Sequence, residues 1–115
     1  MTITKQQILA GTDFTIHVPN PGPCQRGSYA FRVEREHGQG DDDFRVSLLV
    51  AATGTRMWCY LGDLDRTTGE VALGARTFLR ADSFCVKLLG RVLARVWADD
   101  LAAVLKHGYK VSRAA

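Results

Sequence analysis

Residues 58–73 constrain the fold of this 115-residue chain more than any other segment. From Met57 to Leu61 the side chains point alternately to opposite faces, which is the period-two pattern of a strand buried on one side. Asp65, Thr68 and Gly69 then supply a tight turn, because Asp can accept hydrogen bonds from the backbone after it and Gly can take a positive φ at little cost. The segment therefore predicts a β-hairpin, and with it a sheet.

The rest of the chain predicts more strands before this hairpin and helices after it. Side chains alternate over residues 13–18, 28–36 and 44–52, and the strand after the turn covers 70–72 or continues to 79. A short helix is expected over residues 5–10, with Thr4 as its N-cap. A short final helix, capped by Asp99 or Asp100, is expected to end at Lys106, and residues 109–111 are a candidate edge strand.

A long amphipathic helix is expected near the C-terminus, because apolar residues recur at three- and four-residue spacing from Phe84 to Trp97. Asp82 or Ser83 is its expected N-cap. Strands followed by helices predict an α+β fold, in which an antiparallel β-meander of about five strands is packed by this amphipathic helix. The short N-terminal and final helices complete it. No repeat or linker is visible, so we expect one domain over residues 1–115.

The net charge is only +3, but the charges are unevenly distributed. An acidic segment over residues 34–43 contrasts with a basic segment over residues 76–95, and together they supply the candidate partner-binding residues. These are Glu34, Glu36, Asp41, Asp42 and Asp43 on one side, and Arg76, Arg80, Lys87, Arg91 and Arg95 on the other. The last three lie four residues apart and line one side of the helix. This basic row is either the solvated face of an amphipathic helix or a site for phosphates or an acidic protein surface.

The sequence predicts no metal site and no cofactor. A calcium loop beginning at Asp63 would need Gly at its sixth position and Glu at its twelfth, where this chain has Thr68 and Gly74. Three adjacent Asp side chains at 41–43 do not converge on one ion, and no glycine-rich phosphate loop is present. The histidines lack metal-ligand spacing and adjoin no obvious nucleophile; they are His17, His37 and His107. We therefore expect a protein that is not an enzyme.

Three scattered cysteines argue against a disulfide framework or a zinc ribbon. Cys59 and Cys85 fall at apolar positions and are expected in the core, while Cys24, in a Pro/Gly loop, is the one expected to be exposed and reactive. No apolar run approaches the roughly 20 residues that cross a bilayer, and the first residues lack the apolar centre of a secretory signal. We therefore expect a cytoplasmic protein without membrane contact.

The hairpin and the following helix carry a series of local motifs. A strand ends in Tyr-Leu-Gly, an Asp-x-x-Thr-Gly turn and a further strand follow, and a Ser-capped, aromatic-rich helix comes last. The residues that carry these motifs are Trp58, Tyr60, Leu61, Gly62, Asp65, Thr68, Gly69, Val71, Leu73, Ser83, Phe84, Leu89 and Trp97. In these motifs, over residues 28–111, the chain resembles small proteins of phages and other mobile elements. Longer relatives carry a four-Cys zinc ribbon after this region, which this sequence lacks, so neither metal nor ribbon-mediated binding is carried over.

This resemblance implies a binding protein that acts in the cytoplasm of a bacterial host cell. The leading hypothesis is a non-enzymatic, anti-CRISPR-like inhibitor of a host defence nuclease or nucleoprotein complex. It would act by protein–protein contact, through either the acidic loop or the basic helix. The alternative is a nucleic-acid-binding protein that uses the basic helix 83–97. The sequence names neither the partner nor the oligomeric state.

Overall fold

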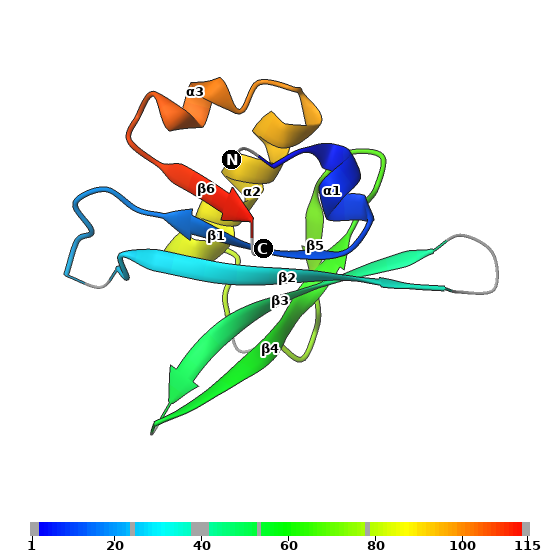
Figure 1. Ribbon diagram of the computed structural model, residues 1–115. Coiled ribbons are helices and arrows are strands. Elements are labelled where there is room, and N and C mark those ends of the chain that lie inside the picture. Colours follow the sequence, from blue (N-terminus) through cyan, green and yellow to red (C-terminus); the bar gives the residue numbers. More distant parts are fainter. Residues whose placement is uncertain (1–2, 24, 38–41, 53, 78, 114–115) are drawn as a thin grey trace.

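The computed structural model describes residues 3–23, 25–37, 42–52, 54–77 and 79–113 (Figure 1). Its elements, in chain order, are α1 (Lys5–Leu9), β1 (Thr12–His17), β2 (Ser28–Glu36), β3 (Asp43–Ala52), β4 (Thr55–Leu64), β5 (Val71–Leu73), α2 (Phe84–Trp97), α3 (Ala102–Leu105) and β6 (Lys110–Arg113). The strands form one six-stranded sheet in the order β5-β4-β3-β2-β1-β6, with every pair antiparallel. The α+β fold with a β-meander is therefore confirmed, and β6 adds a strand beside β1.

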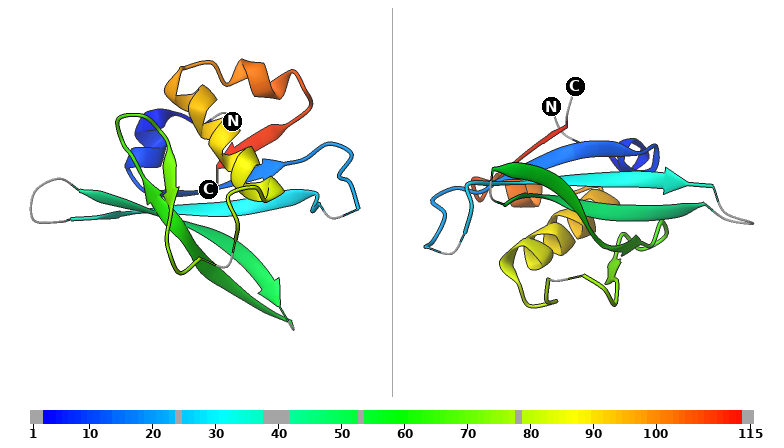
Figure 2. Two further views of the ribbon diagram at one scale, coloured as in Figure 1. Left: turned by 180° about the vertical axis from the view of Figure 1, so that it is seen from behind. Right: turned by 90° about the horizontal axis from the view of Figure 1, so that it is seen from below.

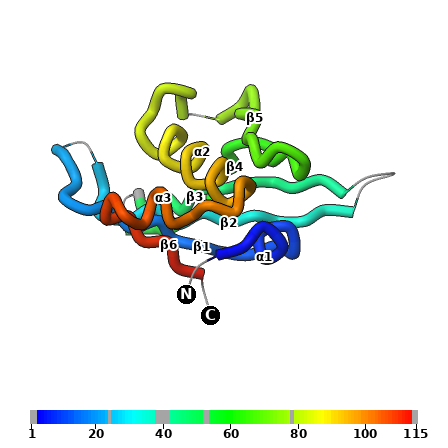
Figure 3. Tube along the Cα trace, turned by 90° about the horizontal axis from the view of Figure 1, so that it is seen from above, coloured from blue at the N-terminus to red at the C-terminus, as the bar shows by residue number. Residues whose placement is uncertain are grey.

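The core lies between the sheet and α2, which crosses one face of the sheet (Figures 2 and 3). Alternate residues of the strands point into it, and the apolar side of α2 meets them. The largest fully buried side chains are Phe14, Phe31, Ile8, Ile16, Leu61, Leu88, Leu89, Leu93, Val33, Val46 and Val92. Within the described residues, no helix has the length and apolar character needed to cross a membrane.

The expected turn between β4 and β5 is present and is tied to the end of α2. Asp65 Oδ1 accepts hydrogen bonds from the backbone N–H groups of Thr67 at 2.8 Å and Thr68 at 3.2 Å. Gly69 has a φ of 78°, and the Trp97 indole Nε1–H donates to the carbonyl oxygen of Arg66 at 2.9 Å. The turn and the last residue of α2 therefore form one packed unit.

The helix ends match some sequence expectations and correct one. Thr4 forms a capping box with Gln7, as its N-cap role predicts. Ser83 occupies the N-cap position of α2, although its hydroxyl donates to the carbonyl oxygen of Arg80. Asp99 and Asp100 do not cap α3, whose N-cap is Leu101.

The reason is that the chain must first reverse at the end of α2. Asp99 takes a left-handed φ of 54°, and its N–H donates to the carbonyl oxygen of Val96 at 3.1 Å. The N–H of Asp100 donates to the carbonyl oxygen of Arg95 at 2.8 Å. This pair of bonds is a Schellman motif. The two acidic residues therefore end α2 instead of starting α3.

Large aromatic side chains such as Trp58 and Tyr60, in a strand that alternates, are expected in the core, but both lie on the outer face of the sheet. Trp58 lies opposite Leu49 and Tyr60 opposite Ser47, on the side that points away from α2. Arginines of β2 and β3 cover both rings. The Arg32 guanidinium lies 4.2 Å from the Trp58 ring centroid, and that of Arg45 lies 4.7 Å from the Tyr60 ring centroid. Stacked guanidinium groups thus replace core packing here.

Candidate anion-binding surface

The structure places the candidate partner-binding residues in two separate regions. Glu34 and Glu36 lie in β2, Asp43 begins β3 and Asp42 directly precedes it, near the far end of the projecting β2–β3 hairpin (Figure 1). Asp41 lies outside the described residues. The basic candidates are exposed on α2 and on the segment that leads into it; they are Arg76, Arg80, Lys87, Arg91 and Arg95.

Arginines pair with two of the four described acids at the hairpin end, Glu36 and Asp42. The Arg35 Nε–H donates to Asp42 Oδ2 at 2.8 Å, and His37 Nδ1 lies 3.0 Å from Asp42 Oδ1. These bonds, that of Arg35 above all, lower the pKa of the Asp42 carboxyl. Arg45 Nη1 lies 3.2 Å from Glu36 Oε1, and this contact contributes most to raising the pKa of Arg45. The acidic end therefore presents less free charge than its sequence suggests.

The basic stripe, which we define as Lys87, Arg91 and Arg95, is different. Neither Lys87 nor Arg91 has an ion-pair partner among the described residues. Arg95 Nη1 lies 3.5 Å from Asp100 Oδ2, but both side chains are half exposed, and such a pair holds its members weakly. Successive cations of the stripe are about 6 Å apart along the helix axis. The stripe is thus a row of three solvent-facing charges of one sign.

The residues beside these cations are small. Gly90, Ala94 and Ala98 are exposed on the same side of the helix, and no atom lies within 4 Å of a Cβ built on Gly90. An extended anion can therefore approach the helix backbone without meeting a large side chain.

A pocket opens at the C-terminal half of the stripe. It is a hollow of about 480 Å³ lined by Pro19, Arg91, Arg95, Ala103, Val104, His107 and Tyr109. We call it the α2–α3 pocket. Its lining combines two guanidinium groups, an imidazole and a phenol with an apolar floor at the buried Val104. No carboxylate is among these lining residues, so the pocket is suited to an anion.

Three separated segments build the walls of this pocket. Gly108, which follows α3, has a φ of 92°, and a Cβ at this position would lie 3.1 Å from Pro19. The chain after β1 therefore packs closely on the turn between α3 and β6. That turn is held by hydrogen bonds from the N–H of His107 to Val104 at 3.2 Å and from the N–H of Gly108 to Leu105 at 3.0 Å.

Sequence reasoning missed that His107 and Tyr109 join the basic helix. The sequence predicts a helix that ends at Lys106 and an edge strand over residues 109–111. In the structure His107 follows the last residue of α3 by two positions, and Tyr109 directly precedes β6. Their spacing from Arg91 and Arg95 matches no motif, because the pocket depends on how α3 folds back on α2. Only the three-dimensional packing could bring these four residues together.

The described residues offer no sign of a metal site or a disulfide. No group of three or more His, Cys, Asp or Glu side chains among them could hold an ion. Cys85 is buried and Cys59 is half-buried, both as free thiols. Cys24 lies outside the described residues.

Comparison with known proteins adds no relative. No family model matches the chain, and no curated protein or solved structure matches it significantly. Evidence for function therefore comes from the surface of the protein itself.

Proposed function

We propose that this protein binds nucleic acid through the basic stripe on α2. The observation that carries the proposal is the row of like charges on α2. Lys87 and Arg91 face solvent without an ion-pair partner among the described residues, and Arg95 has only the half-exposed Asp100. On the β2–β3 hairpin, Glu36 and Asp42 are each paired with an arginine, while Glu34 and Asp43 have no ion pair among the described residues. A surface that keeps its charges unpaired is available to an external polyanion.

The chemistry of the stripe suits the phosphate backbone and not base edges. Its cations would replace counterions on successive phosphates, and this interaction carries no sequence information. Three contacts predict a slope of log affinity against log salt of about −2 to −3 for duplex DNA. Raising the salt from about 50 mM to about 200 mM should then weaken binding by about 40-fold.

Charge reversal tests the proposal. Anisotropy of labelled single-stranded and duplex DNA and RNA should report binding by the native protein at low salt. The combined variant Lys87→Glu/Arg91→Glu/Arg95→Glu should lose it, because every phosphate contact of the stripe becomes a repulsion.

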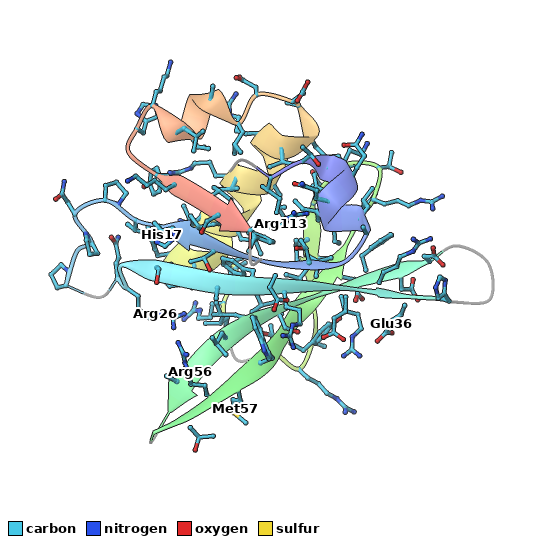
Figure 4. The ribbon with its side chains drawn as sticks, viewed as in Figure 1. His17, Arg26, Glu36, Arg56, Met57 and Arg113 are labelled. Carbon is cyan, nitrogen blue, oxygen red and sulfur yellow. The ribbon has the colours of Figure 1, made fainter. Side chains whose placement is uncertain are left out.

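A matched control changes the net charge by the same amount at other exposed positions. It combines Arg56→Glu, Lys110→Glu and Arg113→Glu, which lie in β4 and β6 and not on α2 (Figure 4 labels Arg56 and Arg113). This variant should retain most of the affinity. Absence of binding to every nucleic acid at low salt, or equal loss in both variants, would contradict the proposed stripe.

A second candidate function is inhibition of a host defence nuclease, and one observation favours it. Met57 is a large apolar side chain that is 54% exposed, at the free end of the β3–β4 hairpin (Figure 4). An exposed apolar anchor on a projecting hairpin suits a protein partner better than a phosphate backbone. The outcome that supports it is recovery of phage plaques when the protein is expressed in bacteria that carry an active CRISPR nuclease. Met57→Glu should abolish that recovery, and no recovery with the native protein would exclude these nucleases as the target.

A further inference from the structure

We propose that the α2–α3 pocket binds a terminal phosphate monoester, and that it directs the basic stripe to the phosphorylated end of a nucleic acid strand. This inference rests on the proposed function and adds the chemical group that the pocket recognises. Arg91 and Arg95 belong both to the stripe and to the pocket. A strand lying along the stripe would therefore bring one of its phosphates to the pocket.

The polar groups of the pocket come from different elements and face a common hollow. Arg91 and Arg95 lie one helical turn apart on α2, while His107 and Tyr109 come from the segment between α3 and β6. Guanidinium groups donate two parallel hydrogen bonds to phosphate oxygens. The imidazole and the phenol can each donate one more. Four donors around one small volume match the three terminal oxygens of a monoester better than the two free oxygens of an internal diester.

Charge leads to the same ligand. A phosphate monoester carries close to two negative charges near neutral pH, and two arginines supply two positive charges without a carboxylate in the lining. Asp100 lies 3.5 Å from Arg95 in a half-exposed pair. A bound phosphate can displace this weak contact, because it offers Arg95 a stronger acceptor.

The shape of the pocket favours a chain end. Residues of α2, of α3 and its following turn, and Pro19 line the hollow, which is open to solvent on its remaining side. Packing of Pro19 against Gly108 holds the last wall in place. An internal phosphate continues into the chain in two directions, whereas a terminal phosphate needs only one exit.

Two short strands that differ only at their 5′ end test the inference. Both carry a fluorophore at the 3′ end, and one has a 5′-phosphate where the other has a 5′-hydroxyl. The native protein should bind the phosphorylated strand about 10-fold more tightly, because this difference in affinity corresponds to at least one additional charge-assisted hydrogen bond.

Variants then separate the pocket from the stripe. Lys87→Ala removes a stripe cation outside the pocket lining, so it should weaken both strands and preserve their ratio. Arg91→Ala removes a cation that belongs to both the stripe and the pocket. It should therefore weaken the binding of both strands and bring the ratio of their affinities close to one. His107→Ala and Tyr109→Phe should also lower the ratio, and the second change keeps the ring that packs on the core.

Several results would overturn the inference, and they differ from failure of the proposed function. Equal binding of the two strands, or an unchanged affinity ratio in Arg91→Ala, would refute the phosphate site in the pocket while leaving the proposed role of the stripe intact. If neither strand binds, the proposed function fails, and NMR titration with thymidine 5′-monophosphate and with thymidine then tests separately whether the pocket binds a phosphate monoester. Shifts at His107 and Tyr109 with the monophosphate only would support it as a site for a free phosphate monoester, and no difference between the two ligands would refute it.

Discussion

At the scale of single residues, the glycines of this chain differ sharply in what they do. Gly69 lies in the β4–β5 turn with a φ of 78°, and a Cβ there would come within 2.7 Å of the Trp97 ring. Gly90 lies on the exposed side of α2, and no atom lies within 4 Å of the place that its Cβ would occupy. The first is required by the backbone and by a close approach, and the second is required by neither.

Alanine substitution of these two glycines should therefore have opposite effects. Gly69→Ala should lower the free energy of unfolding by about 2–3 kcal/mol, because it adds left-handed strain of about 1–2 kcal/mol and displaces the Trp97 hydrogen bond. Gly90→Ala should raise the free energy of unfolding by about 0.5–1 kcal/mol through better helix propensity. Urea unfolding of the two variants beside the native protein measures both. A stable Gly69→Ala protein would show that the turn does not depend on Trp97.

At the scale of elements, much of the secondary structure follows from local signals. The alternation of side chains over residues 28–36 predicts the bounds of β2, and the turn chemistry of Asp65 and Gly69 predicts the hairpin of β4 and β5. Sequence-based predictions are wrong where tertiary contacts decide which face of an element is buried. Trp58 looks like a core residue from its type, but the face it occupies is set by which side α2 covers, and the guanidinium that shields it comes from β2. The α2–α3 pocket could not be predicted for the same reason.

The β2–β3 hairpin also has a predicted pH dependence. Hydrogen bonds from Arg35 and His37 lower the pKa of Asp42 in the folded protein. A carboxyl with a depressed folded-state pKa stabilises the fold above its unfolded-state pKa, and that stabilisation is lost as the pH falls through the folded value. We therefore expect the free energy of unfolding to fall as the pH drops below the ordinary aspartate pKa of 3.8.

Neutral substitutions test this dependence. Asp42→Asn should flatten the acid limb of the curve of unfolding free energy against pH, since the titrating group is gone. Asp43→Asn is the matched control, because the described residues give Asp43 no ion pair, and it should leave the limb steeper than Asp42→Asn does. Equal limbs in the two variants would show that Asp42 does not titrate with folding.

At the scale of the whole molecule, one core joins nearly all the elements. Buried residues of α1, of the sheet and of α2 belong to a single cluster, and Val111 of β6 is a member of it. The first helix, α1, and the last strand, β6, therefore depend on the same packing as the rest of the sheet. With 115 residues around one cluster, the protein has the size and organisation of domains that unfold in a single cooperative step.

The two tryptophans can test that cooperativity, because they report on different layers. Trp58 lies on the outer face of β4, and Trp97 ends α2 against the β4–β5 turn. In a Trp97→Phe variant fluorescence follows the sheet, and in a Trp58→Phe variant it follows the helix layer. Each variant should give the same urea midpoint by fluorescence and by far-UV circular dichroism, since the two layers share one core. A fluorescence midpoint below the dichroism midpoint in the Trp58→Phe protein alone would mean that α2 detaches from the sheet before the sheet unfolds, and that the basic stripe rests on an independently mobile layer.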